Sequence, residues 1–498
     1  MQYYSTRGYK MKINAAEAII RGLAPDSGLF VPSESDLSLN IEKMPAHDYP
    51  ELAFKIFKPF LSGFRDIEIK NALQKAYSSG NFDHKLVTPL QKLSENLFIL
   101  ELWHGPTSAF KDIALQVLPH LLKTALDNTG YKDELVILTA TSGDTGKSAL
   151  EGFRDIPGIK IVVFYPDNGV SEIQKLQMVT QEGSNVSVTA VTGNFDDTQR
   201  GVKEIFSNSK LASHLASHGF QLTSANSINW GRLLPQLVYY FQAYLSLVDN
   251  KQIRAGEAVN YVVPTGNFGN ILAGYYARRL GLPVNKLICA SNQNNILSDF
   301  INTGIYDSNR RLSLTLSPSM DILISSNLER LLFELNSHDP EKISFWMNQL
   351  REKGSYRVDQ QTHEKLGQLF YAGFAGDKKT LSTIKSVYRD YKYLVDTHTA
   401  VGKAVLDSYI ADTADNRPSI ILSTASPFKF AGSVMKALKG PDAVKQKSEL
   451  TILDELVKLT GIDAPENLSK LGKKEIKFKQ VITRKALEDH LLSILEID

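Results

Sequence analysis

The stretch Val262-Val-Pro-Thr-Gly-Asn-Phe-Gly-Asn270 passes directly into Ile271-Leu-Ala-Gly-Tyr-Tyr-Ala-Arg278 and decides the fold class. An apolar, β-rich run is followed by a turn with two glycines and then by a helical pattern, which is the order strand, loop, helix. Nearly continuous apolar runs of this kind are typical of strands buried on both faces of a parallel sheet. Six such runs occur along the chain: Leu135–Thr139, Lys160–Phe164, Val186–Val191, Asn260–Val263, Leu287–Ala290 and Ile420–Ser423. Because turns and helical patterns follow several of them, the sequence predicts an open α/β architecture.

The two ends of the chain have a different texture. Residues 1–90 contain a predicted helix at Ala15–Leu23 and a turn into a short strand at Ala24–Pro32, so we expect a separate N-terminal unit. Gly440-Pro441 is a helix-stop signal, and the charged residues of 436–498 predict a C-terminal helical segment. Polar helices and loops at about 300–390 predict an insertion.

The composition excludes several classes of function. The 498 residues include 56 Lys and Arg and 54 Asp and Glu, and the net charge of +2 offers no field that attracts nucleic acid or an anionic membrane. No apolar run reaches the length of about 18 residues that a membrane-spanning helix needs. The first residues also lack the apolar core of a signal peptide. We therefore expect a soluble, cytoplasmic protein without nucleic-acid or membrane partners.

The sequence predicts no metal site. The single cysteine, Cys289, excludes an intramolecular disulfide framework and the usual cysteine-rich zinc sites. His214 and His218 have the i, i+4 spacing of a helical zinc motif, but Leu215 stands where that motif needs glutamate. The acidic residues show no EF-hand spacing.

Lys111 is the first candidate for chemistry, within His104-Gly-Pro-Thr-Ser-Ala-Phe-Lys-Asp112. The turn at Gly105-Pro106 precedes an amphipathic run, so Lys111 is expected in the first turn of a helix, where the dipole disfavours ammonium. Burial would lower its pKa further and leave a free amine for Schiff-base chemistry, whereas an ordinary helix-start lysine is solvated. Ser108 and Lys111 also fit the S-x-x-K signature of acyl-serine hydrolases, but the S-D-N and K-T-G partners of that signature do not occur.

The second candidate is Thr139-Ala-Thr-Ser-Gly-Asp-Thr-Gly-Lys-Ser148, which follows a predicted strand and precedes a predicted helix. It misses a P-loop at one position, because G-x-x-x-x-G-K-[ST] needs glycine where Thr141 stands. A P-loop nucleotidase is therefore an alternative function. We favour capture of a carboxylate or phosphate by free N–H groups at the helix N-terminus, and a helix cap without a ligand is the simpler interpretation.

Three more segments place polar groups at the ends of predicted elements. Gly266 and Gly269 permit a tight turn whose N–H groups converge on a phosphate, although two glycines alone also fit a plain βα turn. No third glycine has Rossmann spacing, which argues against a dinucleotide loop. Thr223–Arg232 concentrates hydrogen-bond donors suited to an oxyanion, or to a polar helix cap. Leu422–Pro427 places hydroxyls at the carboxyl edge of the predicted sheet, where open α/β proteins bind ligands.

Together and in this order, the motifs resemble threonine synthase, a pyridoxal-phosphate enzyme of the tryptophan-synthase-β-like fold, and are most similar to its longer, yeast-like branch. Further matching segments are Tyr4–Arg7, Gly22–Val31, Leu316–Ser326 and Asp396–Gly402. The resemblance implies a fold type II enzyme with two open α/β domains and the cofactor between them. The smaller domain would span about 110–245, and the larger domain would comprise the remainder of residues 91–435.

The resemblance also implies roles for individual residues. Lys111 would bind the aldehyde of pyridoxal 5'-phosphate covalently, and the hydroxyl of Thr424 would face the pyridine nitrogen. The cofactor phosphate would be bound by Gly266, Asn267, Phe268, Gly269 and Asn270. The substrate would be bound by Ser142, Gly143, Asp144 and Thr145 at its α-carboxylate, and by Asn226, Ser227, Asn229 and Arg232 at its phosphate.

Asp144 departs from the wider fold, where many relatives have an asparagine that binds the cofactor's phenolic oxygen. A carboxylate at this position would repel a phenolate unless it is protonated or turned away.

The implied reaction converts O-phospho-L-homoserine and water into L-threonine and phosphate, in a monomer or small homo-oligomer. A serine or threonine dehydratase-like lyase shares the implied fold and is a second alternative. Such an enzyme would lack the N-terminal unit and would not need a pocket for a substrate phosphate.

Overall fold

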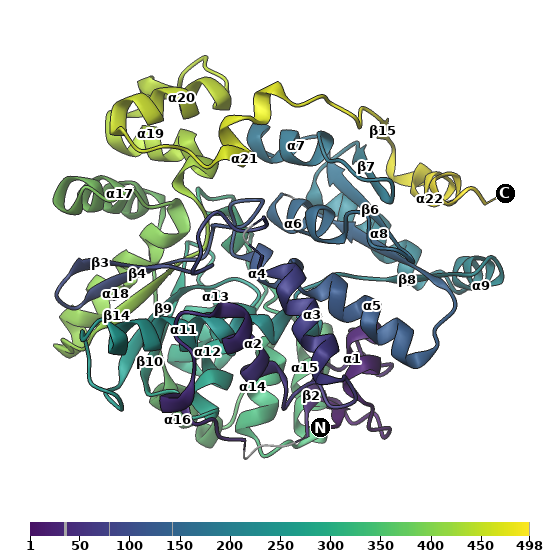
Figure 1. The fold of residues 1–498 in the computed structure, drawn as a ribbon, viewed down its shortest axis with the longest axis horizontal. Helices are drawn as coiled ribbons and strands as arrows, with labels where there is room; N and C mark the ends of the chain where they lie inside the picture. The colour runs from purple at the N-terminus through teal and green to yellow at the C-terminus, as the bar shows by residue number, and fades with distance from the viewer. Residues whose placement is uncertain (34–36, 79, 142, 498) are drawn as a thin grey trace.

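The computed structural model describes residues 1–33, 37–78, 80–141 and 143–497. Two largely parallel sheets and their covering helices form the body of the molecule (Figure 1). The strands of the described residues are β1 Tyr3–Ser5, β2 Phe30–Pro32, β3 Leu90–Ser94, β4 Leu97–Glu101, β5 Glu134–Ala140, β6 Ile159–Pro166, β7 Val186–Val191, β8 Phe220–Thr223, β9 Val259–Pro264, β10 Val284–Ser291, β11 Ile305–Asp307, β12 Ser355–Arg357, β13 Phe370–Phe374, β14 Ser419–Ser423 and β15 Val481–Ile482.

The helices divide into those before and after β9. The first group is α1 Ala15–Arg21, α2 Tyr49–Phe57, α3 Asp66–Ala76, α4 Lys111–Leu115, α5 Leu118–Thr129, α6 Asp144–Phe153, α7 Glu172–Val179, α8 Phe195–Ser207, α9 Ser209–Ser217, α10 Trp230–Leu233 and α11 Pro235–Asp249. The second group is α12 Gly269–Arg279, α13 Ile296–Thr303, α14 Leu328–Leu335, α15 Pro340–Lys353, α16 Gln360–Leu369, α17 Asp377–Tyr391, α18 Thr397–Thr413, α19 Ala431–Lys439, α20 Glu449–Thr460, α21 Glu466–Ser469 and α22 Leu487–Leu495.

The larger sheet has the strand order β13-β10-β9-β14-β4-β3. All its neighbours are parallel except β3 and β4, which are antiparallel. The chain adds β10 and β13 on one side of β9, whereas β14 and β4 lie on the other side. The strand order therefore reverses between β9 and β14, and such a switch point is where open α/β sheets bind ligands.

The smaller sheet has the order β15-β7-β6-β5-β8 and is parallel throughout. Its central strands β5 and β6 are almost entirely buried, because helices cover both faces. Five helices cross it or flank it: α5, α6, α7, α8 and α9. Helix α6, which follows β5 in the chain, lies against α4.

All six predicted strands are confirmed, as β5, β6, β7, β9, β10 and β14. The open α/β architecture is confirmed with them. Among the described residues, eight strands escaped the sequence prediction: β1, β3, β4, β8, β11, β12, β13 and β15. Strand β4 is as buried as the predicted strands, whereas β3 and β8 are edge strands with mixed burial patterns that carry no clear apolar run.

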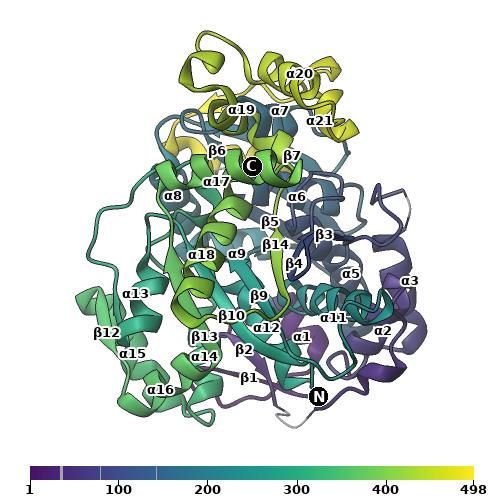
Figure 2. The same cartoon turned by 90° about the vertical axis from the view of Figure 1, so that its left-hand side faces the viewer.

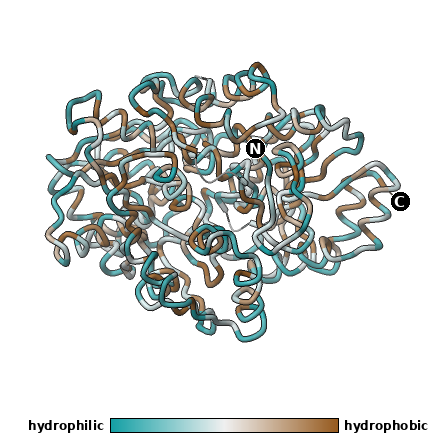
Figure 3. The backbone as a smooth tube through the Cα atoms, turned by 90° about the horizontal axis from the view of Figure 1, so that it is seen from below, coloured by the Kyte–Doolittle hydropathy of each residue, from teal (hydrophilic) through white to brown (hydrophobic). Residues whose placement is uncertain are grey.

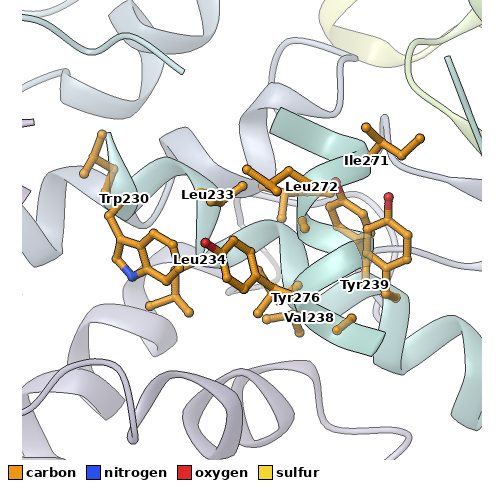
Figure 4. Packing of buried hydrophobic residues seen from close by; sticks show 14 of the residues in the cluster. Trp230, Leu233, Leu234, Val238, Tyr239, Ile271, Leu272 and Tyr276 are labelled. Carbon is orange, nitrogen blue, oxygen red and sulfur yellow. The ribbon is translucent and has the colours of Figure 1, made fainter. Parts of the chain in front are cut away.

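The N-terminal unit lies against both sheets' helices. Its first helix, α1, begins at a capping box formed by Asn14 and Glu17 and packs on α5, and α2 packs on α11. Beneath it is a core of large aromatic and aliphatic side chains from α10, α11 and α12, with Trp230 and Tyr276 in edge-to-face contact at 5.3 Å (Figure 4). In Figure 2 the N-terminal helices α2 and α3 lie on the side opposite to α13 and α15.

Two predicted boundaries differ from the structure. Strand β13 and helix α17 fall inside the predicted insertion at 300–390, yet β13 is the edge strand of the larger sheet, and α17 lies against α18 and α19. The C-terminal segment contains helices, as predicted, but β15 also pairs with β7 and so extends the smaller sheet. A two-residue strand is too short to give a sequence pattern.

Polarity is distributed as in a globular enzyme, with hydrophilic stretches along the outer turns (Figure 3). None of the helices in the described ranges combines the length and apolar content that crossing a bilayer requires. Within those same ranges no three His, Cys, Asp or Glu side chains are grouped as metal ligands would be.

Candidate active site

The candidate site lies at the carboxyl ends of three adjacent strands, β9, β14 and β4. Because these strands are parallel, the segments that follow them meet at one edge of the sheet. The Gly266–Asn270 loop follows β9, Thr424 follows β14, and the segment with Lys111 follows β4. The fold therefore brings three of the sequence-predicted groups to the switch point of the larger sheet.

Lys111 is the first residue of α4, as its sequence position predicted. The preceding residue fixes this helix start to the β14 turn, since the Phe110 N–H donates to the Thr424 carbonyl at 2.9 Å. Burial lowers the pKa of Lys111 to about 8, and the nearby Arg232 and Lys429 cations act in the same direction, against the Asp144 carboxylate. About a tenth of its amine is consequently unprotonated at pH 7, far more than in an ordinary exposed lysine.

The Gly266–Asn270 loop presents a row of free donors. Phe268 has a left-handed backbone, with φ of 60°, and caps the N-terminus of α12. In the part of the chain that the structure describes, the five N–H groups of residues 266–270 donate to no protein acceptor. Gly266 lies against the short 3-10 helix Pro318–Met320, and a Cβ atom on Gly266 would come within 2.8 Å of the Ser319 carbonyl oxygen. The loop thus has the donor set and the helix N-terminus that bind a phosphate.

Asn270 holds the start of α12 in place. The Tyr239 hydroxyl donates to Asn270 Oδ1 at 2.6 Å, and the Tyr240 hydroxyl donates to its main-chain oxygen at 2.8 Å. Its amide Nδ2 is buried and has no partner among the described residues. This side-chain donor is therefore free for an acceptor in the site.

The loop after β5 does not act as a P-loop. Thr141 Oγ1 accepts hydrogen bonds at 3.0 Å from the N–H groups of both Gly143 and Gly146, so donors that a P-loop would offer to phosphate are already used. Lys147, at the P-loop lysine position, is bonded to Glu151 at 3.1 Å and to Gln181. The nucleotidase alternative is wrong on this geometry, because neither the loop nor its lysine is available.

The predicted carboxylate-binding residues are close to Lys111 as far as they are described. Ser142 lies outside the described residues. Gly143 is the N-cap of α6 and has φ of 154°, and Asp144 and Thr145 form the first turn of that helix. The charge on Asp144 acts on the Lys111 amine, which places both groups in the same site.

The predicted phosphate pocket divides into two kinds of residue. Arg232 is buried, and among the described residues it donates only to the Ala225 carbonyl at 2.7 Å and has no partner for its Nε. Asn229 instead uses its side chain within the protein, capping α10 at the Gly231 N–H and donating to the Ile19 carbonyl, both at 2.8 Å. Asn226 is exposed and Ser227 is half-buried in the same turn. Arg232 is therefore the member of this group with donors to spare.

Two residues that sequence analysis did not select, Asn327 and Arg330, form hydrogen bonds that hold the loops of this pocket in place. Asn327 Nδ2 donates to the main-chain oxygens of Asn267 at 2.9 Å and Ser227 at 3.3 Å, so it joins the two predicted phosphate loops. Arg330 is fully buried and donates to Asn327 Oδ1 at 2.6 Å. Both lie just after the matched segment Leu316–Ser326. The sequence did not predict their contacts with the two loops because the loops are far away along the chain.

A hydrogen-bonded pair stands at the N-terminus of α18. His398 is 2.9 Å from Asp396 through its Nδ1, and its Nε2 faces the Ser319 N–H at 3.3 Å. Asp396 also caps the helix, with the His398 N–H at 2.8 Å. The segment Asp396–Gly402 was matched by sequence, and the structure now places it at the same sheet edge as Lys111.

The arrangement fits an aldehyde cofactor that carries a phosphate. It offers a lysine whose amine is partly neutral and a loop with five free N–H groups. It also offers the side-chain nitrogen Nδ2 of Asn270, which is buried and has no partner among the described residues. Thr424 lies between the lysine and the loop, at the end of the middle strand. Such a set can hold pyridoxal phosphate by its aldehyde and its phosphate at once.

Comparisons with known proteins agree with this geometry. Three family models match the chain: threonine synthase N terminus over residues 2–77, pyridoxal-phosphate dependent enzyme over 82–423, and threonine synthase, C-terminal, over 399–490. The threonine synthase of Saccharomyces cerevisiae is 37% identical over 98% of both chains. The human protein threonine synthase-like 1 is 42% identical over 85% of this chain, which spans only 58% of that relative.

Solved structures give the same result. The yeast threonine synthase structure superposes with a TM-score of 0.88 and 35% identity, over 99% of both chains. The pyridoxal-phosphate-bound threonine synthase from Brucella melitensis has a TM-score of 0.87 and 36% identity, again over 99% of both chains.

Proposed function

The chain belongs to the threonine synthase family of pyridoxal-phosphate-dependent enzymes, and on that premise we propose that it converts O-phospho-L-homoserine and water into L-threonine and phosphate. The reaction eliminates phosphate from Cγ and adds water at Cβ. It would be carried out by a lysine that binds the cofactor and a separate cation that binds the substrate phosphate.

The observation that carries the proposal is a buried guanidinium without a counter-ion. Burial lowers the pKa of Arg232 to about 10, and no described carboxylate pairs with it. A buried cation is costly unless it is paired, so a site built around one is suited to an anionic ligand. Since Arg232 also acts electrostatically on Lys111, that anion would lie near the reacting amine.

Lys111, Arg232 and the start of α6 would each have a separate role in the reaction. Bound pyridoxal phosphate supplies an electron sink for carbanions next to the substrate amine. The Lys111 amine would take the proton from Cα and then from Cβ. The N–H groups of Asp144 and Thr145, which Thr141 does not engage, would hold the α-carboxylate, and Arg232 would hold the phosphate until its bond to Cγ breaks. A proton would then return to Cγ, water would add its hydroxyl at Cβ, and a second proton would return to Cα.

The dehydratase-like alternative is less well supported. A dehydratase substrate carries no phosphate ester, so the unpaired Arg232 would have no ligand. The N-terminal unit, which packs on α5 and α11 and reaches the pocket through the Asn229 amide, would also have no role in that reaction. The expected cytoplasmic location and the monomeric or small homo-oligomeric state stay predictions.

The direct test incubates the purified enzyme, loaded with pyridoxal phosphate, with O-phospho-L-homoserine. We expect equal amounts of inorganic phosphate and L-threonine, and loss of both products in Lys111→Ala. Serine and threonine serve as matched substrates for the alternative. Formation of ammonia and a keto acid from them, with no release of phosphate from phosphohomoserine, would contradict the proposal.

A further inference from the structure

Lys429 is a buried cation that the proposed reaction does not use. It lies in the short 3-10 helix Pro427–Phe430 that follows β14 and Thr424, and its side chain is 0% exposed. Its Nζ is 2.8 Å from Asp144 Oδ1 and donates to the Thr107 carbonyl at 2.9 Å. Lys429 therefore ties together the β14 turn, the Lys111 segment and the start of α6.

Asp144 is fully engaged by this and two other contacts. Gln174 Nε2 of α7 donates to Asp144 Oδ1 at 2.9 Å, and Ser319 Oγ donates to Asp144 Oδ2 at 3.0 Å. Burial alone would raise the pKa of Asp144, but the Lys429 and Lys111 cations and these donors hold it well below its usual range. The carboxylate is consequently charged, and its nearest counter-ion is Lys429.

The charges that face the Lys111 amine come from four elements. Asp144 of α6 is negative, and Arg232 of α10 and Lys429 are positive. Asp112 of α4 also faces it, but its carboxylate is bound by the Thr107 N–H at 2.8 Å and hydroxyl at 2.6 Å. Asp144 and Lys429 act on the Lys111 amine in opposite directions. Without Lys429, Asp144 would be left with Lys111 as its nearest cation.

We propose that Lys429 is a positioning residue: by neutralising Asp144 it prevents an ion pair between Asp144 and Lys111, and so keeps the Lys111 amine available to bond the cofactor's aldehyde. The inference rests on the proposed role of Lys111. It also accounts for an aspartate at position 144, because a carboxylate already bound by Lys429, Gln174 and Ser319 does not need Lys111 as a counter-ion. Lys429 acts through Asp144 and touches no reacting atom.

The proposal predicts opposite effects for the two partners. Lys429→Met leaves Asp144 unpaired beside Lys111, which favours the protonated lysine. Asp144→Asn leaves the Lys429 cation unbalanced, which favours the neutral lysine. Lys429→Met combined with Asp144→Asn removes both charges and restores the balance. A rise of one unit in the pKa of Lys111 lowers the neutral fraction at neutral pH about tenfold.

The test measures cofactor capture rather than turnover. Apoenzyme is mixed with pyridoxal phosphate between about pH 6 and about pH 10, and the rate of covalent bonding is followed by the cofactor's visible absorbance and by borohydride trapping. Because the neutral amine attacks the aldehyde, the rate should rise with pH, and the wild-type midpoint should lie near 8. Lys147→Met is the matched control. Like Lys429, Lys147 is a buried lysine; it lies in α6 and is paired with Glu151 at 3.1 Å.

We expect Lys429→Met to move the midpoint upward and slow capture at pH 7 about tenfold, Asp144→Asn to move it downward, and the double variant to return to the wild-type midpoint. The Lys147→Met midpoint should stay in place. An unchanged midpoint in Lys429→Met, or a double variant as slow as Lys429→Met at every pH, would overturn the inference. If Lys429→Met does not fold, an upward or absent shift in Asp144→Asn overturns it. Wild-type enzyme that captures no cofactor at Lys111 would instead refute the proposed function.

Discussion

Lys111 and Arg232 are the two residues on which the proposed chemistry depends, and their surroundings in the protein differ. Lys111 is kept partly neutral by burial and by two neighbouring cations. Arg232 stays cationic, since even after burial the pKa of its guanidinium is about 10, and it has main-chain contact with Ala225 but no described acidic partner. One residue is prepared to form a covalent bond, and the other to hold an anion.

Replacing Arg232 should therefore improve stability and damage function. In Arg232→Met the unpaired buried charge is gone, so we expect the ligand-free enzyme to be about 1–2 kcal/mol more stable to urea. The loss of a charge-assisted contact should raise KM for the phosphorylated substrate about 10- to 100-fold. Cofactor absorbance should not change. The control is Arg310→Met, which breaks a half-buried pair with Asp299; equal KM effects in both variants would refute the assignment.

At this scale the sequence predicted the residues with strong local motifs and missed those that act at a distance. Lys111 and the Gly266–Asn270 loop sit in short, dense motifs beside strands. Lys429 and Arg330 are ordinary basic residues in sequence, and only folding brings Lys429 to Asp144 and Arg330 to the Phe30 carbonyl. Asn229 shows the converse, because a residue in a polar motif turned out to cap a helix.

At the scale of elements, the crossing of α4 and α6 sets the distance between Lys111 and the Asp144 loop. Gly152 of α6 lies against the carbonyl of Leu115, the last residue of α4, and a Cβ atom there would be 1.9 Å from that oxygen. The contact is with the backbone, so the neighbour cannot rotate away. Glycine is required here for close approach of the two helices.

Gly152→Ala should separate these helices. We expect a loss of about 1–3 kcal/mol in the free energy of unfolding from overpacking, together with weaker cofactor binding. Gly432→Ala in α19 is the control, because nothing lies within 4 Å of the added Cβ, and there we expect a gain of about 0.4–1 kcal/mol. Denaturant titration of both variants measures this, and similar stabilities for the two would contradict the packing argument.

Sequence patterns predicted the elements that have a strong period and missed those defined by their partners. Buried strands such as β6 and β9 show nearly continuous apolar runs and were found. Strand β15 has two residues and exists only because β7 offers an open edge. Strand β13 lies within a polar region, and its membership of the larger sheet depends on pairing with β10.

At the scale of the whole molecule, Arg330 connects three regions. Its guanidinium donates to the Phe30 carbonyl of the N-terminal unit at 3.0 Å, to Asn327 and to the Ile228 carbonyl at 2.5 Å. The N-terminal unit is thus bonded to the loop that carries the predicted phosphate ligands. A further link is the ion pair of Arg7 and Glu329 at 2.7 Å.

Arg330→Met should loosen this connection. Removal of three hydrogen bonds to one buried charge should cost about 3 kcal/mol or more in the free energy of unfolding, and the unanchored 226–229 turn should raise KM for the substrate. Arg389→Met removes an exposed arginine paired with Asp390 and should leave the free energy of unfolding unchanged. If thermal and urea denaturation do not distinguish the two variants, the connecting role is refuted.

The sequence predicted three regions but not how they meet. The bounds 1–90 of the N-terminal unit stay a prediction; within them α2 lies against α3, and β1 pairs with β2. Its bond to the active site through Arg330 and Asn229 depends on contacts across 200 residues or more, which carry no local pattern.

The central claim is that Lys111 bonds the cofactor covalently. The most direct measurement reduces the pyridoxal-phosphate-loaded enzyme with borohydride, digests it, and locates the pyridoxyl group by mass spectrometry. The account predicts one modified lysine, Lys111, and no label in Lys111→Ala treated in the same way. A label on another lysine, or retention of the label in Lys111→Ala, would contradict it.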